Sequence, residues 1–241
     1  NGDHTIKALL LGYYSRLKQD AVLIDQQAAH LGLRVGYDYG NRYFADLSAV
    51  YLNGYKLMPG NKGGLSPSIG LGWVISEEDF LSGNSIINYL KLRASAGIIN
   101  YEFTSTSHLL YQRTYLSGSS YTWNDGTSAT SNPIAYLYRA GNPDLGFQKM
   151  KNINLGFEAY LFDNSLYLDA NLFSTRNTDQ VVQRTSYYTA LIGSEIPYEN
   201  YNKTGYSGGE LGILYSRSYG DFSFDLGLNT LYAASKVLKR D

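Results

Sequence analysis

Apolar and polar side chains alternate along several segments of about 10 residues, and this alternation constrains the fold more than any other feature of the chain. The clearest segment runs from Asn152 to Phe162 and reads N-I-N-L-G-F-E-A-Y-L-F. A period of two puts alternate side chains on opposite faces of a β-strand. Its apolar face would carry Ile153, Leu155, Phe157, Ala159 and Leu161. The segment therefore predicts a strand with one apolar face and one polar face.

The same pattern recurs along the chain, and turn-forming residues separate the repeats. Strands are expected at residues 5–14, 31–37, 43–51, 67–75, 89–97, 152–162, 166–174, 211–215 and 222–230. The strands of roughly 9 to 11 residues that this pattern predicts are long enough to cross a bilayer when tilted. Stretches of 18 consecutive apolar residues are absent, so the sequence predicts no transmembrane helix.

Links of alternating length connect these strands. The turns near residues 40, 164 and 220 are tight, whereas the links at 15–28, 52–64, 98–147 and 175–203 are long. The link at 76–88 is intermediate and contains S-E-E-D-F-L, which predicts a helical turn with Ser76 as its N-cap. Outer-membrane barrels combine short periplasmic turns with long outer loops. The predicted fold is all-β: about nine strands of an antiparallel up-and-down transmembrane β-barrel.

Composition excludes several functional classes. The 20 basic and 21 acidic residues give a net charge of −1, which disfavours a nucleic-acid partner. Without cysteine, thiolate catalysis and Cys-built zinc sites are excluded. His4, His30 and His108 stand in no recognisable catalytic context, and neither a nucleotide fingerprint nor a calcium-loop spacing is complete. We therefore expect no catalytic residue, no metal site and no cofactor, and not an enzyme.

Tyrosines in the two longest outer links are the best candidates for ligand contact. Flat rings with polar tips, interleaved with Asn, Ser and Thr, can stack on sugars and donate hydrogen bonds. In the first link the candidates are Tyr115, Tyr121, Trp123, Tyr136 and Tyr138, together with Tyr111. In the second link they are Tyr187 and Tyr188, together with Tyr198 and Tyr201. The alternative is that these rings form the aromatic girdle or the loop packing of a barrel.

Several blocks of sequence carry a family resemblance. They read A-H-L-G-L-R-V-G-Y-D-Y-G-N-R-Y-F-A-D-L-S-A (29–49), L-S-P-S-I-G-L-G-W-V-I-S-E-E-D-F-L (65–81), I-N-Y-L-K-L-R-A-S-A-G (87–97) and G-N-P-D-L-G-F-Q-K-M-K-N-I-N-L-G-F-E-A-Y-L-F-D-N-S-L-Y-L-D-A-N-L-F-S-T-R-N-T-D (141–179). In this order, the blocks resemble successive barrel strands of SusC/RagA-like TonB-dependent outer-membrane transporters. The block at 201–215 is similar to a further strand of that family.

The resemblance implies a 22-stranded plugged barrel in the outer membrane of a Gram-negative bacterium. It also implies import of glycan oligosaccharides or peptides, a SusD-like surface lipoprotein as partner, and energy coupling to TonB through a region N-terminal to these strands. Residues 1–241 would then form part of the β-barrel domain, in contact with outer-membrane lipid, with no plug domain.

A soluble all-β carbohydrate-binding module is the alternative, because it would also be rich in Tyr and Gly and poor in charge. It does not account for the alternation of long and short links. A barrel enzyme is a third possibility, and it would need a nucleophile and a base, which the sequence does not offer.

Overall fold

The computed structural model describes residues 3–18, 25–81, 83–103, 109–124, 126, 128–193 and 195–241. Nine strands form one antiparallel sheet in the order β1-β2-β3-β4-β5-β8-β9-β10-β11, and β6 and β7 form a separate pair. The strands are β1 (His4–Leu17), β2 (Gln26–Tyr39), β3 (Tyr43–Asn53), β4 (Gly63–Val74), β5 (Ile87–Tyr101), β6 (Thr114–Asn124), β7 (Ala129–Arg139), β8 (Gln148–Leu161), β9 (Leu166–Gln183), β10 (Tyr198–Tyr219) and β11 (Phe222–Lys239). Short 3-10 turns occur at η1 (Ile75–Glu77), η2 (Asp79–Leu81) and η3 (Ala190–Ile192).

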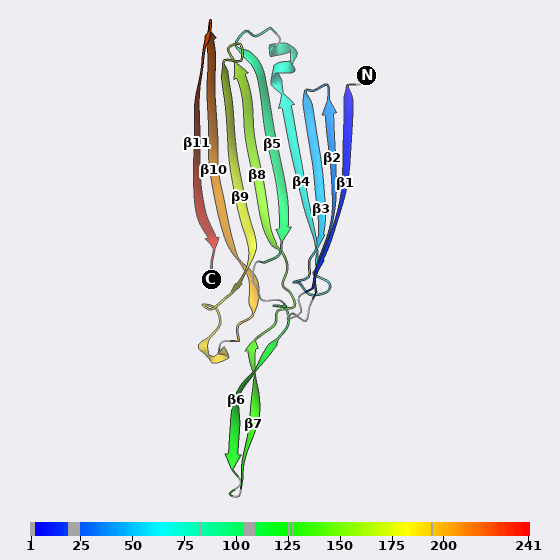
Figure 1. The fold of residues 1–241 in the computed structure, drawn as a ribbon, viewed down its shortest axis with the longest axis vertical. Coiled ribbons are helices and arrows are strands. Elements are labelled where there is room, and N and C mark those ends of the chain that lie inside the picture. The colour runs from blue at the N-terminus through cyan, green and yellow to red at the C-terminus, as the bar shows by residue number, and fades with distance from the viewer. Residues whose placement is uncertain are drawn as a thin grey trace.

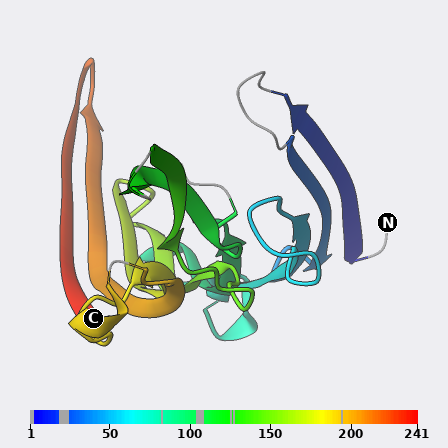
Figure 2. The same ribbon diagram turned by 90° about the horizontal axis from the view of Figure 1, so that it is seen from below.

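The large sheet is curved and open. Seen from below, its strands follow an arc whose two ends, β1 and β11, stand apart (Figure 2). Among the described residues, each of these two strands pairs on one side only. The β6–β7 hairpin projects beyond the lower end of the sheet, away from the tight turns (Figure 1).

No helix in the described part of the chain is long and apolar enough to cross a membrane.

The nine predicted strands are confirmed, but they are longer than expected. Their observed lengths run from 11 residues in β3 to 22 in β10. The link expected at 175–203 is largely strand, because β9 continues to Gln183 and β10 begins at Tyr198 across register shifts near Lys203. The link expected at 98–147 contains the β6–β7 hairpin.

The tight turn between β2 and β3 depends on two residues with positive φ. Gly40 and Asn41 have φ of 58° and 55°, the combination that a type I′ hairpin turn requires. The backbone N–H of Asn41 also donates to the Asp38 carboxylate at 3.0 Å. The expected N-cap is wrong, since η1 follows Val74 without a side-chain cap, and the buried Ser76 hydroxyl has no hydrogen-bond partner in the described part of the chain.

Continuous register gives the large sheet one apolar face. Leu47 pairs with Ile69, Ile69 with Ala96, and Ala96 with Ile153, so one apolar row crosses four strands. The exposed members of this apolar face include Leu33, Leu47, Ile69, Leu71, Leu92, Ile153, Leu155 and Leu172. Ala159 lies on the same face but is buried. A continuous apolar surface that crosses several strands is larger than monomeric soluble proteins usually expose.

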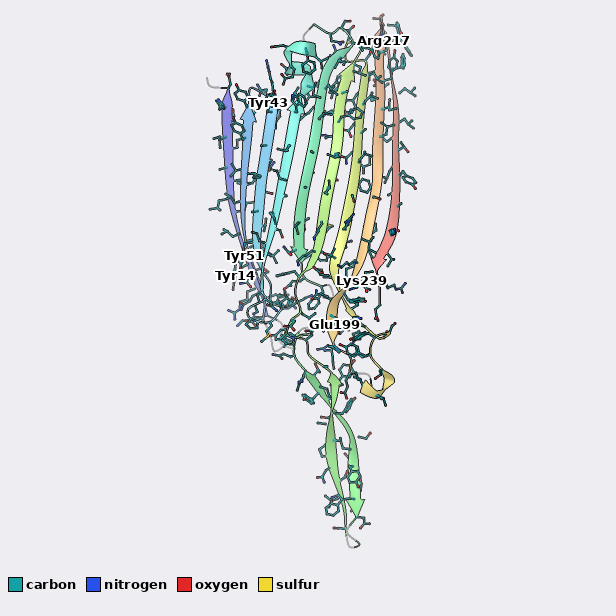
Figure 3. All side chains as sticks on the ribbon, turned by 180° about the vertical axis from the view of Figure 1, so that it is seen from behind. Tyr14, Tyr43, Tyr51, Glu199, Arg217 and Lys239 are labelled. Carbon is teal, nitrogen blue, oxygen red and sulfur yellow. The ribbon has the colours of Figure 1, made fainter. Side chains whose placement is uncertain are left out.

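Aromatic rings stand at both ends of the apolar face. At the tight-turn end, rings stack in series from Tyr39 through Tyr43 to Trp73, with centroids 6.2 and 6.4 Å apart. Tyr14 and Tyr51 lie at the opposite end of the sheet (Figure 3). On β1, His4 and Tyr14 are ten residues apart, which is about 33 Å along the strand and about 25 Å after a tilt of about 40°.

The opposite, polar face holds charged side chains in pairs. Arg34 donates to both carboxylate oxygens of Asp46 at 3.0 and 2.8 Å, and Arg93 pairs with Asp169 at 2.5 Å. Hydroxyl and amide groups fill positions between these pairs, as in the Ser48–Ser68 hydrogen bond of 2.6 Å. Both faces thus follow the alternation that the sequence predicts.

The main hydrophobic core lies among the long links rather than in the sheet. It consists of Leu52, Leu57, Phe103, Leu110, Leu145 and Phe147, which we call the loop junction, with Val181 and Tyr198 packed against it. Leu57, Leu110 and Leu145 are completely buried. The loop junction joins the links that follow β3 and β5 to the link that precedes β8, and it therefore holds the base of the β6–β7 hairpin.

We expect Leu57→Ala to loosen the loop junction. Removing a fully buried leucine side chain typically costs about 2–5 kcal/mol of the free energy of unfolding. Hydrogen–deuterium exchange should become faster at residues 109–113 and 140–147. Met58→Ala is the matched control, because Met58 is the next residue and is 39 % exposed. Equal exchange in the two variants would contradict the structural role of the loop junction.

Candidate functional site

The β6–β7 hairpin carries five of the ten aromatic residues singled out from the sequence. All five are substantially exposed: Tyr115, Tyr121, Trp123, Tyr136 and Tyr138. The hairpin pairs antiparallel, with an irregularity between Ser117 and Ser120. Its rings are therefore presented by a strand pair rather than by an irregular loop.

Three of these rings share one face of the hairpin. Trp123 pairs with Thr130 and Tyr121 with Asn132, so both lie on the face of the even-numbered residues of β7. That face, which we call the aromatic face, consists of Leu116, Tyr121, Trp123, Ile134 and Tyr136, and Tyr138 lies at the register shift beside it. Tyr115 pairs with Leu137 and lies on the other side.

Charge is nearly absent from this hairpin. Among its described residues, Arg139 is the only charged side chain, and it is 9 % exposed. Its guanidinium donates to the Thr114 hydroxyl at 2.9 Å, across the first pair of the hairpin. The aromatic face therefore offers ring surfaces, hydroxyls and amides to a neutral partner.

Close backbone packing fixes the base of the hairpin. A Cβ atom at Gly141 would lie 2.5 Å from the carbonyl oxygen of Tyr111, so only glycine fits there. The side-chain amide of Asn142 donates to the carbonyl of Tyr198 at 2.7 Å, and that of Asn61 donates to the carbonyl of Pro143 at 3.1 Å. These bonds connect the hairpin base to β10 and to the link after β3.

A second aromatic group surrounds Arg184 in the link between β9 and β10. The guanidinium carbon lies 4.0 Å from the ring centre of Tyr187 and 3.8 Å from that of Tyr201. Arg184 also pairs with Glu199 at 3.2 Å and with Asp241 at 3.8 Å. Glu199 lies near the lower end of β10, close to this link (Figure 3). We call these residues the arginine clamp.

The arginine clamp orients both candidate tyrosines of this link. The Tyr188 hydroxyl donates to Glu199 at 2.5 Å, and this hydrogen bond, followed by partial burial, raises the pKa of Tyr188. Tyr187 packs edge-on against Tyr188 at 5.3 Å between ring centres and remains 65 % exposed. Of this pair, Tyr187 offers the larger free surface.

The other three tyrosines considered in these links have structural contacts. Tyr198 packs against the loop junction, Tyr201 lies between Arg184 and Lys239, and Tyr111 is half-buried at the hairpin base. Sequence reasoning missed Arg184 and the buried leucines of the loop junction. A turn signal at Asn142-Pro143 marks part of this region, but no periodicity connects residues so far apart in the chain.

The described residues contain no cluster of three or more His, Asp or Glu side chains that could hold a metal ion. His108 lies outside the described residues.

Sequence comparison finds similarity to TonB-dependent receptors. Residues 18–239 match the family model described as TonB dependent receptor-like, beta-barrel. TonB-dependent receptor P39 of Formosa agariphila is 29 % identical over 167 residues, which cover 69 % of this chain and 14 % of that protein. TonB-dependent receptor SusC of Bacteroides thetaiotaomicron is 28 % identical over 158 residues, which cover 60 % of this chain and 15 % of that protein.

Solved structures share the fold. The RagAB peptide importer in its "closed-closed" state superposes with a TM-score of 0.78 at 15 % identity, covering 100 % of this chain and 29 % of the matched chain. Its "open-open" state gives a TM-score of 0.77 at 16 % identity, covering 97 % and 28 %.

The chain spans only 14 to 16 % of the length of the curated relatives it matches. The family-model match nevertheless extends over nearly the whole chain, and the open antiparallel sheet agrees with it. The chain therefore belongs to the TonB-dependent receptor β-barrel family and is SusC/RagA-like.

Proposed function

We propose that this chain is part of the barrel wall of an outer-membrane transporter that imports nutrients, either glycan oligosaccharides or peptides. TonB-dependent receptors are transporters rather than enzymes, and SusC/RagA relatives are outer-membrane proteins of Gram-negative bacteria. The apolar face with aromatic rings at both ends is the observation that carries the proposal for this chain.

Lipid is the solvent that fits the apolar face. Outer-membrane barrels present an apolar band about 25 Å tall between two aromatic girdles, and the rings of His4 and Tyr14 span a similar height. The polar face, with its Arg34–Asp46 and Arg93–Asp169 pairs, would then line the lumen. Further strands of a longer protein would pair with β1 and β11, whose free edges are otherwise prone to aggregation.

The aromatic face would lie outside the cell, where nutrient arrives. A SusD-like lipoprotein is the proposed surface partner, because this chain is similar both to SusC and to the RagAB peptide importer. TonB would act through a region outside these strands. Tyr121, Trp123, Tyr136 and Tyr138, together with Tyr187 and Tyr188, are the proposed nutrient contacts, and Tyr115 would contact nutrient only from the opposite side of the hairpin.

A soluble carbohydrate-binding module is the second candidate. It would use the same exposed rings, but it would leave the leucines of the apolar face in water. The two candidate functions can be distinguished by testing whether the apolar face of β8 contacts lipid.

A lipid-phase quencher should reach β8 from one side only. Phe157 lies on the apolar face and Glu158 on the polar face. In the full-length transporter, a fluorescent probe attached at position 157 should be quenched from within the bilayer, and a probe at position 158 should not. Equal quenching at both positions, or none at either, would exclude the barrel assignment for this strand.

The hairpin and the tight turns should lie on opposite sides of the membrane. Protease added to intact cells that carry the full-length transporter should cut within residues 98–147, because long links face outward in such barrels. The turn at Gly40-Asn41 should stay intact until the outer membrane is permeabilised. Cleavage of the hairpin only after permeabilisation would reverse the proposed orientation.

Removing two rings from the aromatic face should weaken nutrient uptake. Exposed aromatic contacts are commonly worth about 1 kcal/mol or more each, so the double variant Tyr121→Ala with Trp123→Ala should raise the KM of uptake about 10- to 30-fold. Assembly of the barrel should not change, since neither ring is buried. Tyr115→Ala is the matched variant on the opposite side of the hairpin. Normal uptake of every glycan and peptide tested in the double variant would count against the proposed contact.

A further inference from the structure

A hollow lies on the described part of the apolar face. This open hollow of about 710 Å³ lies across β3, β4, β5 and β8, with Tyr37 of β2 at its edge. Ala45 and Ala94 flank Leu71 in one row of the sheet, and these short side chains leave space between larger neighbours. Leu155 stands at one side of the hollow, and Tyr43 and Trp73 close the end nearest the tight turns.

Charged groups stand directly beyond this ring-bearing end. The carboxylate of Glu78 accepts hydrogen bonds from the Tyr43 hydroxyl at 2.5 Å and from the Trp73 indole N–H at 3.0 Å. The Arg42 guanidinium lies 4.0 Å from the same carboxylate. Tyr43 lies near the tight-turn end of the sheet (Figure 3).

Glu78 holds this group together while Arg42 remains accessible. Hydrogen bonds from Tyr43 and Trp73 lower the pKa of Glu78, so its carboxylate stays charged at neutral pH. The Glu78 side chain is 17 % exposed and that of Arg42 is 40 % exposed. Since Glu78 is the only acidic partner of Arg42 in the described part of the chain, the guanidinium keeps donors for another anion.

We propose that the hollow binds one glycerophospholipid of the inner leaflet, with an acyl chain along Leu71 and Ala94 and the phosphate at Arg42. The inference rests on the proposed function, because it requires the apolar face to contact lipid. The positive charge of Arg42 and the position of the hollow beside the aromatic rings of the tight-turn end favour a phospholipid. The guanidinium of Arg42 can donate two parallel hydrogen bonds to a phosphate group. The rings of Tyr43 and Trp73 lie at the tight-turn end of the apolar face, where the aromatic residues of a barrel meet the lipid headgroups.

A second copy of the chain fits the hollow less well. A protein partner would have to bring an acceptor to the remaining N–H donors of Arg42 or bury them without one, and burying unsatisfied donors is costly. A phospholipid supplies the anion and the apolar chain in one molecule.

The test uses the full-length transporter, delipidated in detergent and titrated with phosphatidylglycerol, with bound lipid counted by native mass spectrometry. Diacylglycerol with the same acyl chains serves as the ligand without phosphate. The wild-type protein should bind phosphatidylglycerol about tenfold more tightly than diacylglycerol, and Arg42→Gln should abolish this preference.

Ala45→Leu and Ala49→Leu form a matched pair on β3. Both residues lie on the apolar face, but only Ala45 lines the hollow. Ala45→Leu should lower phosphatidylglycerol binding about tenfold, as filling the space for an acyl chain requires, and Ala49→Leu should leave it unchanged. Equal phosphatidylglycerol binding in these two variants would overturn the lipid site. It would also be overturned if the wild-type protein were a dimer and Ala45→Leu made it a monomer without changing lipid binding, because the hollow would then bind a second copy of the chain.

Failure of this proposal is distinguishable from failure of the proposed function. If the probe at position 157 is quenched from the bilayer and the lipid titration shows no preference, only the lipid site is overturned. If that probe is not quenched, the sheet is not a membrane wall, and the lipid site is overturned with it.

Discussion

Side chains of a β-strand point to opposite sides in turn, and strand register carries this alternation across a sheet. In this chain, continuous register from β2 to β9 keeps one apolar face, and the charged pairs Arg34–Asp46 and Arg93–Asp169 lie on the other. A shift of one residue at any pairing would put leucines among the Arg–Asp pairs. The two faces therefore depend on correct register more than on any single contact.

Local patterns were sufficient to predict the large sheet. Strict alternation at 152–162 and 222–230, with turn residues such as Gly40-Asn41 between strands, specifies antiparallel hairpins without long-range information. The strand ends were less predictable, because alternation fades in the polar residues beyond Ser174 while backbone pairing continues across irregular register near Lys203. Pairing there depends on the neighbouring strand rather than on side-chain periodicity.

The hairpin and the loop junction show what a single sequence could not supply. Residues 114–139 alternate weakly, and the irregularity between Ser117 and Ser120 breaks the period, so strand formation was not evident. The loop junction assembles Leu57, Leu110 and Leu145 from links that are distant in sequence, and only tertiary structure brings them together. The exposed rings were nevertheless identified from their type and setting, because aromatic residues among Ser, Thr and Asn in a long link are unusual.

Within the described ranges, the β6–β7 hairpin forms a sheet of its own, separate from the nine-stranded sheet. Its rings lie on this strand pair, and the buried leucines and Asn142 hold it at its base. Residues near its tip could thus diverge, lengthen or be exchanged between relatives without disturbing the wall. Such an arrangement lets ligand preference evolve independently of membrane insertion, because different residues determine the two properties.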